Sequence, residues 1–392
     1  MRGRPAPPMS KPLRVHHIIT GLPVGGAQTM LGQLLARGDP TRLDQRVISL
    51  GGLGALGADL RANGIVVDAL DMRRGPAGAI DAARLAGWLR RDKPDLVQTW
   101  LYHADLIGGL AARLAGCRHL VWNIRHTDLR PGSDKRSTIL VARACAAVSG
   151  WLPARIVCNS EAALRTHVAL SYPRDKFVVI PNGIDPARFC PDPAAYAAVR
   201  RELGVAAETP LIGLVGRFHP QKDHRNFLRA AAMLVGRHER LRFLLCGENV
   251  TPDNARLNEW VAEHGLGDRV HLLGVRQDMP QLTAALDVAT SSSSHGEAFG
   301  NVIVEAMACG VPCVVTDVGD SRSIVGASGR VVAPGEPEAL ARACTDLLVA
   351  SPEDRAALSA AARRRTIKHY AIEGVVERYQ ALYEEVADRH GR

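Results

Sequence analysis

The chain has 392 residues, of which 46% are hydrophobic and 23% are charged, and this composition excludes a disordered chain, a collagen and a small disulfide-linked scaffold. Residues 1–190 contain 26 basic and 14 acidic side chains, a net charge of +12, whereas the remainder nets −3. Such a basic half attracts anionic membrane surfaces, phosphorylated ligands or nucleic acid. Aromatic residues are only 4%, which argues against a stacking platform for single-stranded nucleic acid.

Short β-branched runs alternate with amphipathic segments along almost the whole chain, and this predicts parallel sheets with right-handed crossovers. The expected strands are Leu13–Thr20, Gln45–Leu50, Ile65–Ala69, Asp95–Thr99, His119–Asn123, Arg155–Cys158, Lys176–Ile180, Leu211–Val215, Arg242–Cys246, Val270–Leu272, Val288–Thr290 and Cys313–Thr316. The expected helices include Gly26–Ala36, Ile80–Arg91, Asp105–Leu114, Gln221–Val235 and Val302–Ala308.

The series is interrupted once, at residues 181–193, which hold four prolines and one glycine. This is the composition of a linker, so we expect two doubly wound domains, one on each side of it.

Eight cysteines are present, none in a CxxC pair, and most lie in apolar runs. They indicate buried thiols in a reducing compartment, so we expect a cytoplasmic protein. Cys309 and Cys313 have no matching pair of His or Cys ligands, and no metal site is predicted.

In doubly wound sheets, ligands bind outside the carboxyl ends of the strands. The first such loop carries Gly25 and Gly26 directly before a helix, where a ligand can approach the backbone and the helix N-terminus favours an anion. The glycine spacing is not that of the dinucleotide fingerprint GxGxxG.

The first strand of the second half leads into Gly216, Arg217 and, five residues later, Lys222. Two cations beside a glycine that permits close approach are suited to clamp a diphosphate. The loops that carry Gly247 and Val275 follow neighbouring strands and are candidates to wall in a nucleotide base.

The most informative stretch is 291–319, which contains two carboxylates eight residues apart, Glu297 and Glu305. Each can accept hydrogen bonds from the hydroxyls of a different ring. The free N–H groups near Gly300–Val302 suit a pyrophosphate that lies between the two rings.

These residues resemble the retaining glycosyltransferases of family 4, which have the GT-B fold. The resemblance runs over nearly the whole chain and rests on GGAQ at 25–28, His126, PNGID at 181–185, the GRF and QKD runs within 216–223, and the carboxylate pair. It implies an α/β fold of two doubly wound Rossmann-like domains that face each other across a cleft, with the Tyr-bearing last helix crossing back to the N-terminal domain.

The expected domains follow from this likeness. They are a basic, Pro-rich tail at 1–12, an N-terminal acceptor domain at 13–185, a nucleotide-sugar donor domain at 186–370 and a C-terminal helix at 371–392 that packs on the N-terminal domain.

The resemblance also implies roles. Glu305 would hold the ribose hydroxyls, Glu297 the donor sugar, and Arg217 and Lys222 the diphosphate. The remaining donor-binding candidates are Gly25, Gly26, Gly216, Gly247, Val275, Phe299, Gly300 and Asn301. The active-site histidine would be His126, with His103 as the competing candidate.

The family's chemistry retains the anomeric configuration, uses a nucleotide sugar as co-substrate and needs no cofactor or metal when cations stabilise the leaving diphosphate. UDP- or GDP-sugars are the expected donors. Gln28, Asp320 and Ser323 depart from the family pattern and leave the choice of donor open.

The expected acceptor is a glycan or lipid-linked saccharide in cell-surface polysaccharide or glycolipid biosynthesis. Arg125, Arg130, Lys135, Arg136 and Arg143 surround an apolar run and suggest a helix that lies peripherally on an anionic membrane. Alternatives are a GT-B epimerase, a non-catalytic subunit that binds nucleotide sugars, and a nucleic-acid binder, for which no motif is present.

Overall fold

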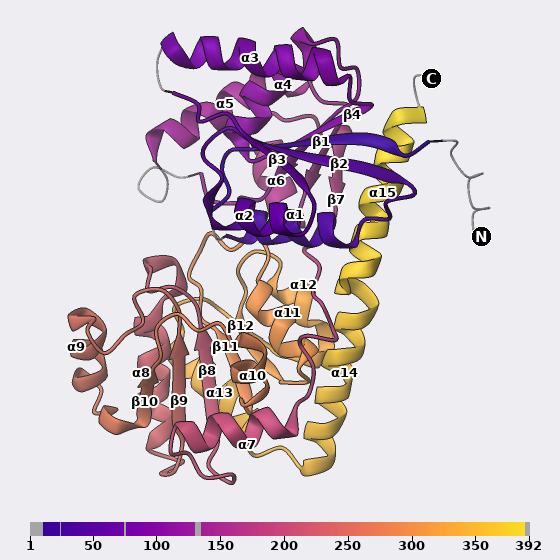
Figure 1. Cartoon of the computed structure of the whole chain (residues 1–392). Coiled ribbons are helices and arrows are strands. Elements are labelled where there is room, and N and C mark those ends of the chain that lie inside the picture. Colours follow the sequence, from indigo (N-terminus) through magenta and orange to yellow (C-terminus); the bar gives the residue numbers. More distant parts are fainter. Residues whose placement is uncertain (1–10, 24, 74–75, 130–134, 389–392) are drawn as a thin grey trace. The chain divides into compact units, whose positions relative to one another are not determined.

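The computed structural model describes residues 11–23, 25–73, 76–129 and 135–388 (Figure 1). They form two compact units. The first combines the chain up to Gly183 with the chain from Glu373 onward, and the second spans Ile184–Ile372.

The first unit is built on a seven-stranded parallel sheet of order β3-β2-β1-β4-β5-β6-β7. The strands are β1 (Leu13–Ile19), β2 (Leu43–Ser49), β3 (Val66–Ala69), β4 (Leu96–Trp100), β5 (Leu120–Ile124), β6 (Arg155–Cys158) and β7 (Phe177–Val179). Its helices are α1 (Gly26–Arg37), α2 (Gly54–Ala62), α3 (Pro76–Asp92), α4 (Gly109–Leu114), α5 (Arg136–Ser149) and α6 (Glu161–Ala169). Helices α1 and α2 cover one face of the sheet and α3, α4 and α5 the other (Figure 1).

The second unit repeats this plan with a six-stranded parallel sheet of order β10-β9-β8-β11-β12-β13. The strands are β8 (Leu211–Val215), β9 (Arg242–Cys246), β10 (Val270–Leu272), β11 (Val288–Ser291), β12 (Cys313–Thr316) and β13 (Arg330–Val332). Its helices are α7 (Pro193–Glu202), α8 (His224–Val235), α9 (Ala255–Glu263), α10 (Met279–Ala284), α11 (Asn301–Ala308), α12 (Ser321–Val325), α13 (Pro337–Leu348) and α14 (Pro352–Tyr370). The four central strands are largely buried because helices cover both faces, whereas the edge strands β10 and β13 are half-buried.

The last helix, α15 (Ile372–Asp388), returns the chain to the first unit. Arg42, at the start of β2, donates hydrogen bonds to Glu377 and Glu384 of this helix, and the buried hydroxyl of Tyr383 donates to Gln98 of β4. The predicted fold class, two doubly wound sheets with a final helix that crosses back, is therefore confirmed.

All expected strands are present within two residues of their predicted bounds, and β13 is a strand that the sequence analysis missed. Three helices start differently from the prediction. Helix α3 begins at Pro76, four residues before the expected Ile80. The segment from Asp105 begins with a π-helix, η1 (Ala104–Gly108), and α8 begins at His224 instead of Gln221. Asp223 has a left-handed backbone (φ 46°) and caps α8 by accepting from the N–H of Asn226, so Lys222 lies in the preceding turn.

Candidate active site

Three loops meet at the carboxyl edge of the second sheet. The N–H of Gly216 donates to the carbonyl of Cys246 (2.8 Å), and the N–H of Gly247 donates to that of Gly274 (2.8 Å). Gly247 has φ +152°, and a Cβ there would lie 2.3 Å from the carbonyl oxygen of Gly216, so only glycine allows this approach. Val275 follows these loops and is 66% exposed.

The predicted cation and carboxylate meet directly. Lys222 Nζ lies 2.5 Å from Glu297 Oε2, and both side chains are largely buried. Ser293 donates to the same carboxylate oxygen at 3.0 Å. Ser292 donates to the carbonyl of Lys222 at 2.7 Å, which holds the turn in place. The serine-rich loop therefore fixes both ends of the ion pair, a role that sequence reasoning missed. Its only sequence signal was the run of serines after a strand.

Glu305 lies one turn inside α11 and has a different environment. Its carboxyl makes no hydrogen bond or ion pair to any residue that the structure describes. Burial raises the pKa of Glu305 to about 7, and the charge of Arg188 opposes this shift. Arg188 belongs to the linker and was not predicted to act here. A half-buried carboxyl without a protein donor is suited to accept hydrogen bonds from a ligand.

The N-terminus of α11 begins at Gly300, which makes no side-chain cap, and the first turn contains no acidic residue. The N–H of Asn301 donates to the carbonyl of Phe299 (3.1 Å) and that of Ile303 to the carbonyl of Gly300 (3.0 Å), so this end offers an anion the positive pole of the helix dipole. The ring of Phe299 is buried and packs edge-on against Tyr370 (5.6 Å between ring centroids), so this residue can offer only its backbone. Arg217 is exposed, and burial together with this neighbouring charge lowers the pKa of His219.

In the first unit, His126 and His103 follow the adjacent strands β5 and β4. His126 Nε2 lies 2.6 Å from the carbonyl oxygen of Asp128, and its ring packs edge-on against Tyr102. His103 is half-buried, and burial lowers its pKa. Both histidines thus lie at the edge of the sheet where a ligand is expected.

Arg125 was grouped with the cations expected to face a membrane, but its side chain points inward. Its guanidinium donates to Asn123, to Asn182 of the PNGID run and to the hydroxyl of Tyr379 on α15. It also lies over the ring of Trp100, 5.0 Å from the centroid. These partners turn it inward and hold the backbone next to His126.

The glycine pair lies at the start of α1, with Gly25 as the N-cap and Gly26 as the first helical residue. A Cβ on Gly25 would come within 2.7 Å of the Gln28 side-chain oxygen, so the end of that side chain would have to shift. The amide of Gln28 donates to the carbonyl of Gly21 at 3.1 Å and closes the loop. Gln28 thus braces the glycine loop.

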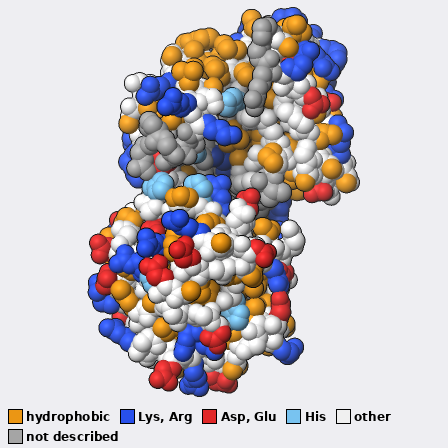
Figure 2. Space-filling model, turned by 90° about the vertical axis from the view of Figure 1, so that its left-hand side faces the viewer, with side chains coloured by type: hydrophobic (Ala, Val, Ile, Leu, Met, Phe, Trp, Pro, Cys, Tyr) orange, Lys and Arg blue, Asp and Glu red, His pale blue; other side chains and the backbone are white. Residues whose placement is uncertain are grey.

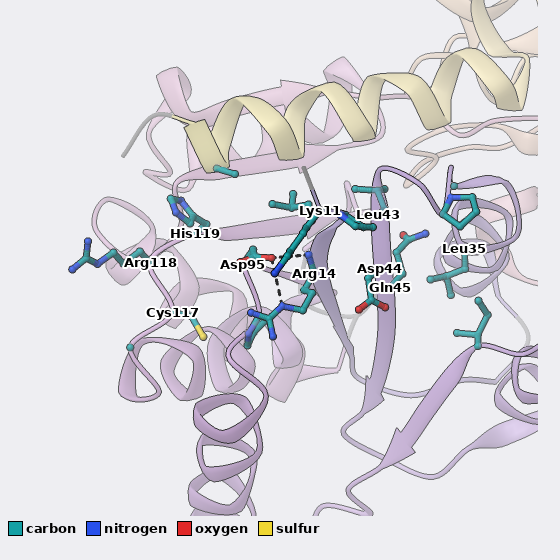
Figure 3. Close-up of a pocket in the computed structure, with 18 residues that line it drawn as sticks. Lys11, Arg14, Leu35, Leu43, Asp44, Gln45, Asp95, Cys117, Arg118 and His119 are labelled. Carbon is teal, nitrogen blue, oxygen red and sulfur yellow. Dashed lines mark hydrogen bonds and ion pairs between the residues drawn. The ribbon is translucent and has the colours of Figure 1, made fainter. Parts of the chain in front are cut away.

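A pocket of about 1170 Å³ lies elsewhere, at the amino ends of strands β1, β2, β4 and β5 (Figure 3). Lys11, Arg14, Asp44, Asp95 and His119 are among the side chains that line it, and Arg14 pairs with Asp95 across it. None of the candidate residues borders this pocket, and it lies at the edge opposite to the one where such sheets bind ligands.

Two family models match the chain. Residues 24–188 match the model described as Glycosyltransferase Family 4, and residues 209–350 match the model described as Glycosyl transferases group 1.

Relatives agree with these models. The chain is 32% identical over 269 residues to the 2-deoxystreptamine glucosyltransferase of Streptomyces kanamyceticus, covering 65% of this chain and 68% of that protein. It is 27% identical over 241 residues to the UDP-Gal:alpha-D-GlcNAc-diphosphoundecaprenol alpha-1,3-galactosyltransferase of Escherichia coli, covering 60% and 61%.

Among solved structures, Anabaena HepE in complex with UDP-glucose superposes with a TM-score of 0.81 at 23% identity, covering 95% of this chain and 100% of HepE. This similarity supports the GT-B fold. Both sheets, the carboxylate pair at a strand's carboxyl edge, the two family models and the relatives lead to one assignment: the chain is a glycosyltransferase of family 4.

Proposed function

We propose that this glycosyltransferase transfers a sugar from a UDP- or GDP-activated donor to a glycan or lipid-linked saccharide, with retention of anomeric configuration and without a metal ion or other cofactor. The observation that carries the proposal is the edge of the second sheet, where Lys222, Glu297 and the N-terminus of α11 are gathered. The carboxyl of Glu305 lies there too and has no hydrogen-bond partner within the described part of the chain.

Each group has a distinct part in this proposal. Glu305 accepts hydrogen bonds from the ribose hydroxyls, and Glu297 accepts from hydroxyls of the donor sugar. Arg217, Lys222 and the positive N-terminal end of α11 stabilise the negative charge that develops on the departing diphosphate. Their positive charge is the reason why no divalent cation is needed in this scheme.

Lys222 has two proposed partners, Glu297 before the donor binds and the donor diphosphate afterwards. Without a donor it is paired with Glu297, which keeps two largely buried charges neutralised. When a diphosphate arrives, the ammonium can turn toward it, and Glu297 is then released to the sugar hydroxyls.

In the first unit we propose that His126 contacts the transferred sugar and that Gly25 and Gly26 contact the donor phosphates. The carbonyl of Asp128 orients the imidazole of His126, and the Arg125 contacts fix the loop on which it lies. His103 remains the competing histidine.

The acceptor class rests on the relatives. The Escherichia coli relative carries a diphosphoundecaprenol-linked sugar in its name, and the Anabaena structure holds UDP-glucose. We extend these two features to this chain as a lipid-linked acceptor and a nucleotide sugar. The location proposed for the reaction is the cytoplasmic face of a membrane. Among the residues that the structure describes, no helix is long and apolar enough to cross one.

The test is a transfer assay with a panel of UDP- and GDP-sugars, in which release of the nucleoside diphosphate and formation of the product are both measured. Lys222→Met should lower turnover by about a hundredfold or more, as expected for loss of a transition-state charge contact. NMR of the product reports the anomeric configuration, and chelator should leave the rate unchanged. Inversion of configuration, or a rate that disappears with chelator and returns with a divalent ion, would refute the corresponding part of the proposal.

A further inference from the structure

The start of helix α8 borders two neighbouring cavities of the second unit. One has a volume of about 520 Å³ and lies between the loop after β8 and helix α9, and the other has a volume of about 370 Å³ and extends toward the end of α9. Asp223 and Arg225 line both cavities, so the two adjoin, and we call them together the α8 site. None of the four charged residues of the proposed donor site borders either cavity, so the α8 site is a separate place.

The larger cavity has a wall in which aromatic rings hold arginines. The ring of Trp260 on α9 packs against that of Phe218, with 5.5 Å between the centroids. The guanidinium carbon of Arg256 lies 5.5 Å from the centroid of the Trp260 ring, and that of Arg225 lies 6.0 Å from it. A guanidinium that stacks on an aromatic ring keeps the N–H groups of its edge for a carboxylate or a phosphate. The wall therefore places two cations beside the cavity that they line.

The α8 site has more cations than acidic partners for them. Arg225 pairs with Glu263 at 3.5 Å, and both side chains are about half exposed. One carboxylate oxygen of Asp223 accepts from a backbone N–H at the start of α8. Arg229 and Arg256 line the site and have no ion-pair partner among the residues that the structure describes. Figure 2 views the molecule from the side on which α9 lies in Figure 1, and the second unit carries charges of both signs there, so the unpaired arginines are a local feature.

Asn226, in the first turn of α8, has an amide group that the fold does not satisfy. Its side chain is only 4% exposed and borders the smaller cavity, and neither the amide oxygen nor the amide nitrogen has a hydrogen-bond partner within the described part of the chain. A buried amide without partners is unfavourable for folding. A fully ionised anion could accept from the amide nitrogen but could not donate to the amide oxygen. A hydroxyl group both donates and accepts, so a hydroxylated molecule can satisfy both ends of the amide.

We propose that the α8 site binds a sugar that carries a carboxylate or a phosphate group. The stacked guanidiniums and Arg229 bind the anionic group, and the amide of Asn226 exchanges hydrogen bonds with hydroxyls of the ring. The two cavities together are large enough for a sugar ring with its anionic group. An acidic sugar unit of a glycan and a free sugar phosphate share this chemistry. The site is additional to the proposed donor site, and the inference holds for any donor or acceptor.

The experiment is isothermal titration calorimetry of the full chain with four probes. Glucuronic acid and glucose 6-phosphate combine a hydroxylated ring with an anionic group, whereas glucose lacks the anionic group and inorganic phosphate lacks the ring. At least one of the two anionic sugars should bind about tenfold or more tightly than glucose and inorganic phosphate, because each of these lacks one set of contacts. Binding of glucuronic acid alone identifies an acidic sugar unit as the ligand, and binding of glucose 6-phosphate alone identifies a phosphorylated sugar.

Two variants remove the proposed contacts. Arg229→Gln should weaken the binding of the anionic sugar about tenfold, because it removes a charge-assisted hydrogen bond made by an exposed side chain. Asn226→Leu should also weaken binding, yet it should leave the free protein at least as stable as wild type, because leucine has a similar shape and no unsatisfied polar atom. An asparagine with a merely structural role would lose stability in this variant. The matched control is Arg355→Gln, which removes an exposed arginine of α14 in the same unit and should bind as wild type does.

A competition experiment separates the α8 site from the donor site. A saturating nucleoside diphosphate, UDP or GDP, should leave the binding of the anionic sugar unchanged, and Arg229→Gln should keep the thermal stabilisation that this nucleotide gives to wild type. Failure of the proposed function would appear as absent nucleotide binding with sugar binding intact. The inference would be overturned if neither anionic sugar binds, if glucose or inorganic phosphate binds as tightly, or if the nucleotide displaces the sugar. Binding of wild-type strength in both Arg229→Gln and Asn226→Leu would also overturn it.

Discussion

Glu305→Gln should make the protein more stable at pH 8 while it weakens donor binding. The carboxyl of Glu305 has its pKa raised from 4.5 to about 7 by burial, so ionising it in the folded protein is unfavourable. Between these two values the folded chain binds more protons than the unfolded chain, and the free energy of unfolding therefore falls as the pH rises. Glutamine carries no charge and avoids this loss.

The magnitude follows from the shift. At pH 8 the full difference of about 2.5 pKa units corresponds to ~3 kcal/mol, whereas at pH 5 less than ~1 kcal/mol has been lost. The stabilising effect of Glu305→Gln relative to wild type should therefore be about 2 kcal/mol larger at pH 8 than at pH 5. For a domain of this size that corresponds to a few degrees in Tm.

The assay is thermal unfolding of wild type and variant at both pH values, with Glu259→Gln as the control. Glu259 is an exposed glutamate on α9 of the same unit, and its replacement should change Tm equally at both pH values. If Glu305→Gln shifts Tm by the same amount at pH 5 and pH 8, the carboxyl is not held in an unfavourable ionised state. That result would contradict the interpretation that the carboxyl of Glu305 accepts its hydrogen bonds from a bound ligand. A nucleoside diphosphate should stabilise wild type more at pH 8 than at pH 6, because the ionised carboxylate is the better acceptor for ribose hydroxyls.

Three further variants test contacts seen in the structure. Lys222→Met leaves the carboxylate of Glu297 largely buried and without its cation, and it should lower the free energy of unfolding by about 3 kcal/mol in a urea titration. The double variant Lys222→Met/Glu297→Gln should restore the stability, because it removes the buried charge as well. Tyr379→Phe removes the hydroxyl that accepts from Arg125 and should cost about 1–3 kcal/mol and lower the transfer rate; an unchanged rate would show that this contact does not position the catalytic loop. Gly319→Ala places a Cβ 1.9 Å from the carbonyl oxygen of Glu297 at φ +63° and should lower Tm by several degrees, whereas an unchanged Tm would show that the two loops are not in contact.

The sequence predicts which edge of the sheet carries the proposed site, because the strands of a doubly wound fold all run in parallel. Lys222 and Glu297 are 75 residues apart, yet each follows a strand, and β8 and β11 are neighbours in the sheet. Parallel strands bring their carboxyl ends to one edge, so the meeting of these two side chains was predictable in outline. The serines that hold them were not, because a hydroxyl's partner depends on the path of the loop.

Arg125 shows why side-chain direction was beyond prediction. In the sequence it is one of several cations near a helix, and a solvated position is the ordinary expectation. Its partners Asn182 and Tyr379 lie 57 and 254 residues away. The last helix brings Tyr379 back to Arg125. This contact is a tertiary one, and the sequence around Arg125 contains no pattern that predicts it.

The carboxyl of Glu305 differs in one physical property from buried polar groups whose partners the fold supplies. His17 is fully buried, but the indole N–H of Trp100 donates to one ring nitrogen and Gln45 meets the other, so the fold itself satisfies it. The carboxyl of Glu305 has no such compensation among the residues that the structure describes. Folding alone gains nothing from leaving a carboxyl without a donor. Such a local cost persists when a bound molecule removes it, and the molecule that we propose for this site is a nucleotide sugar.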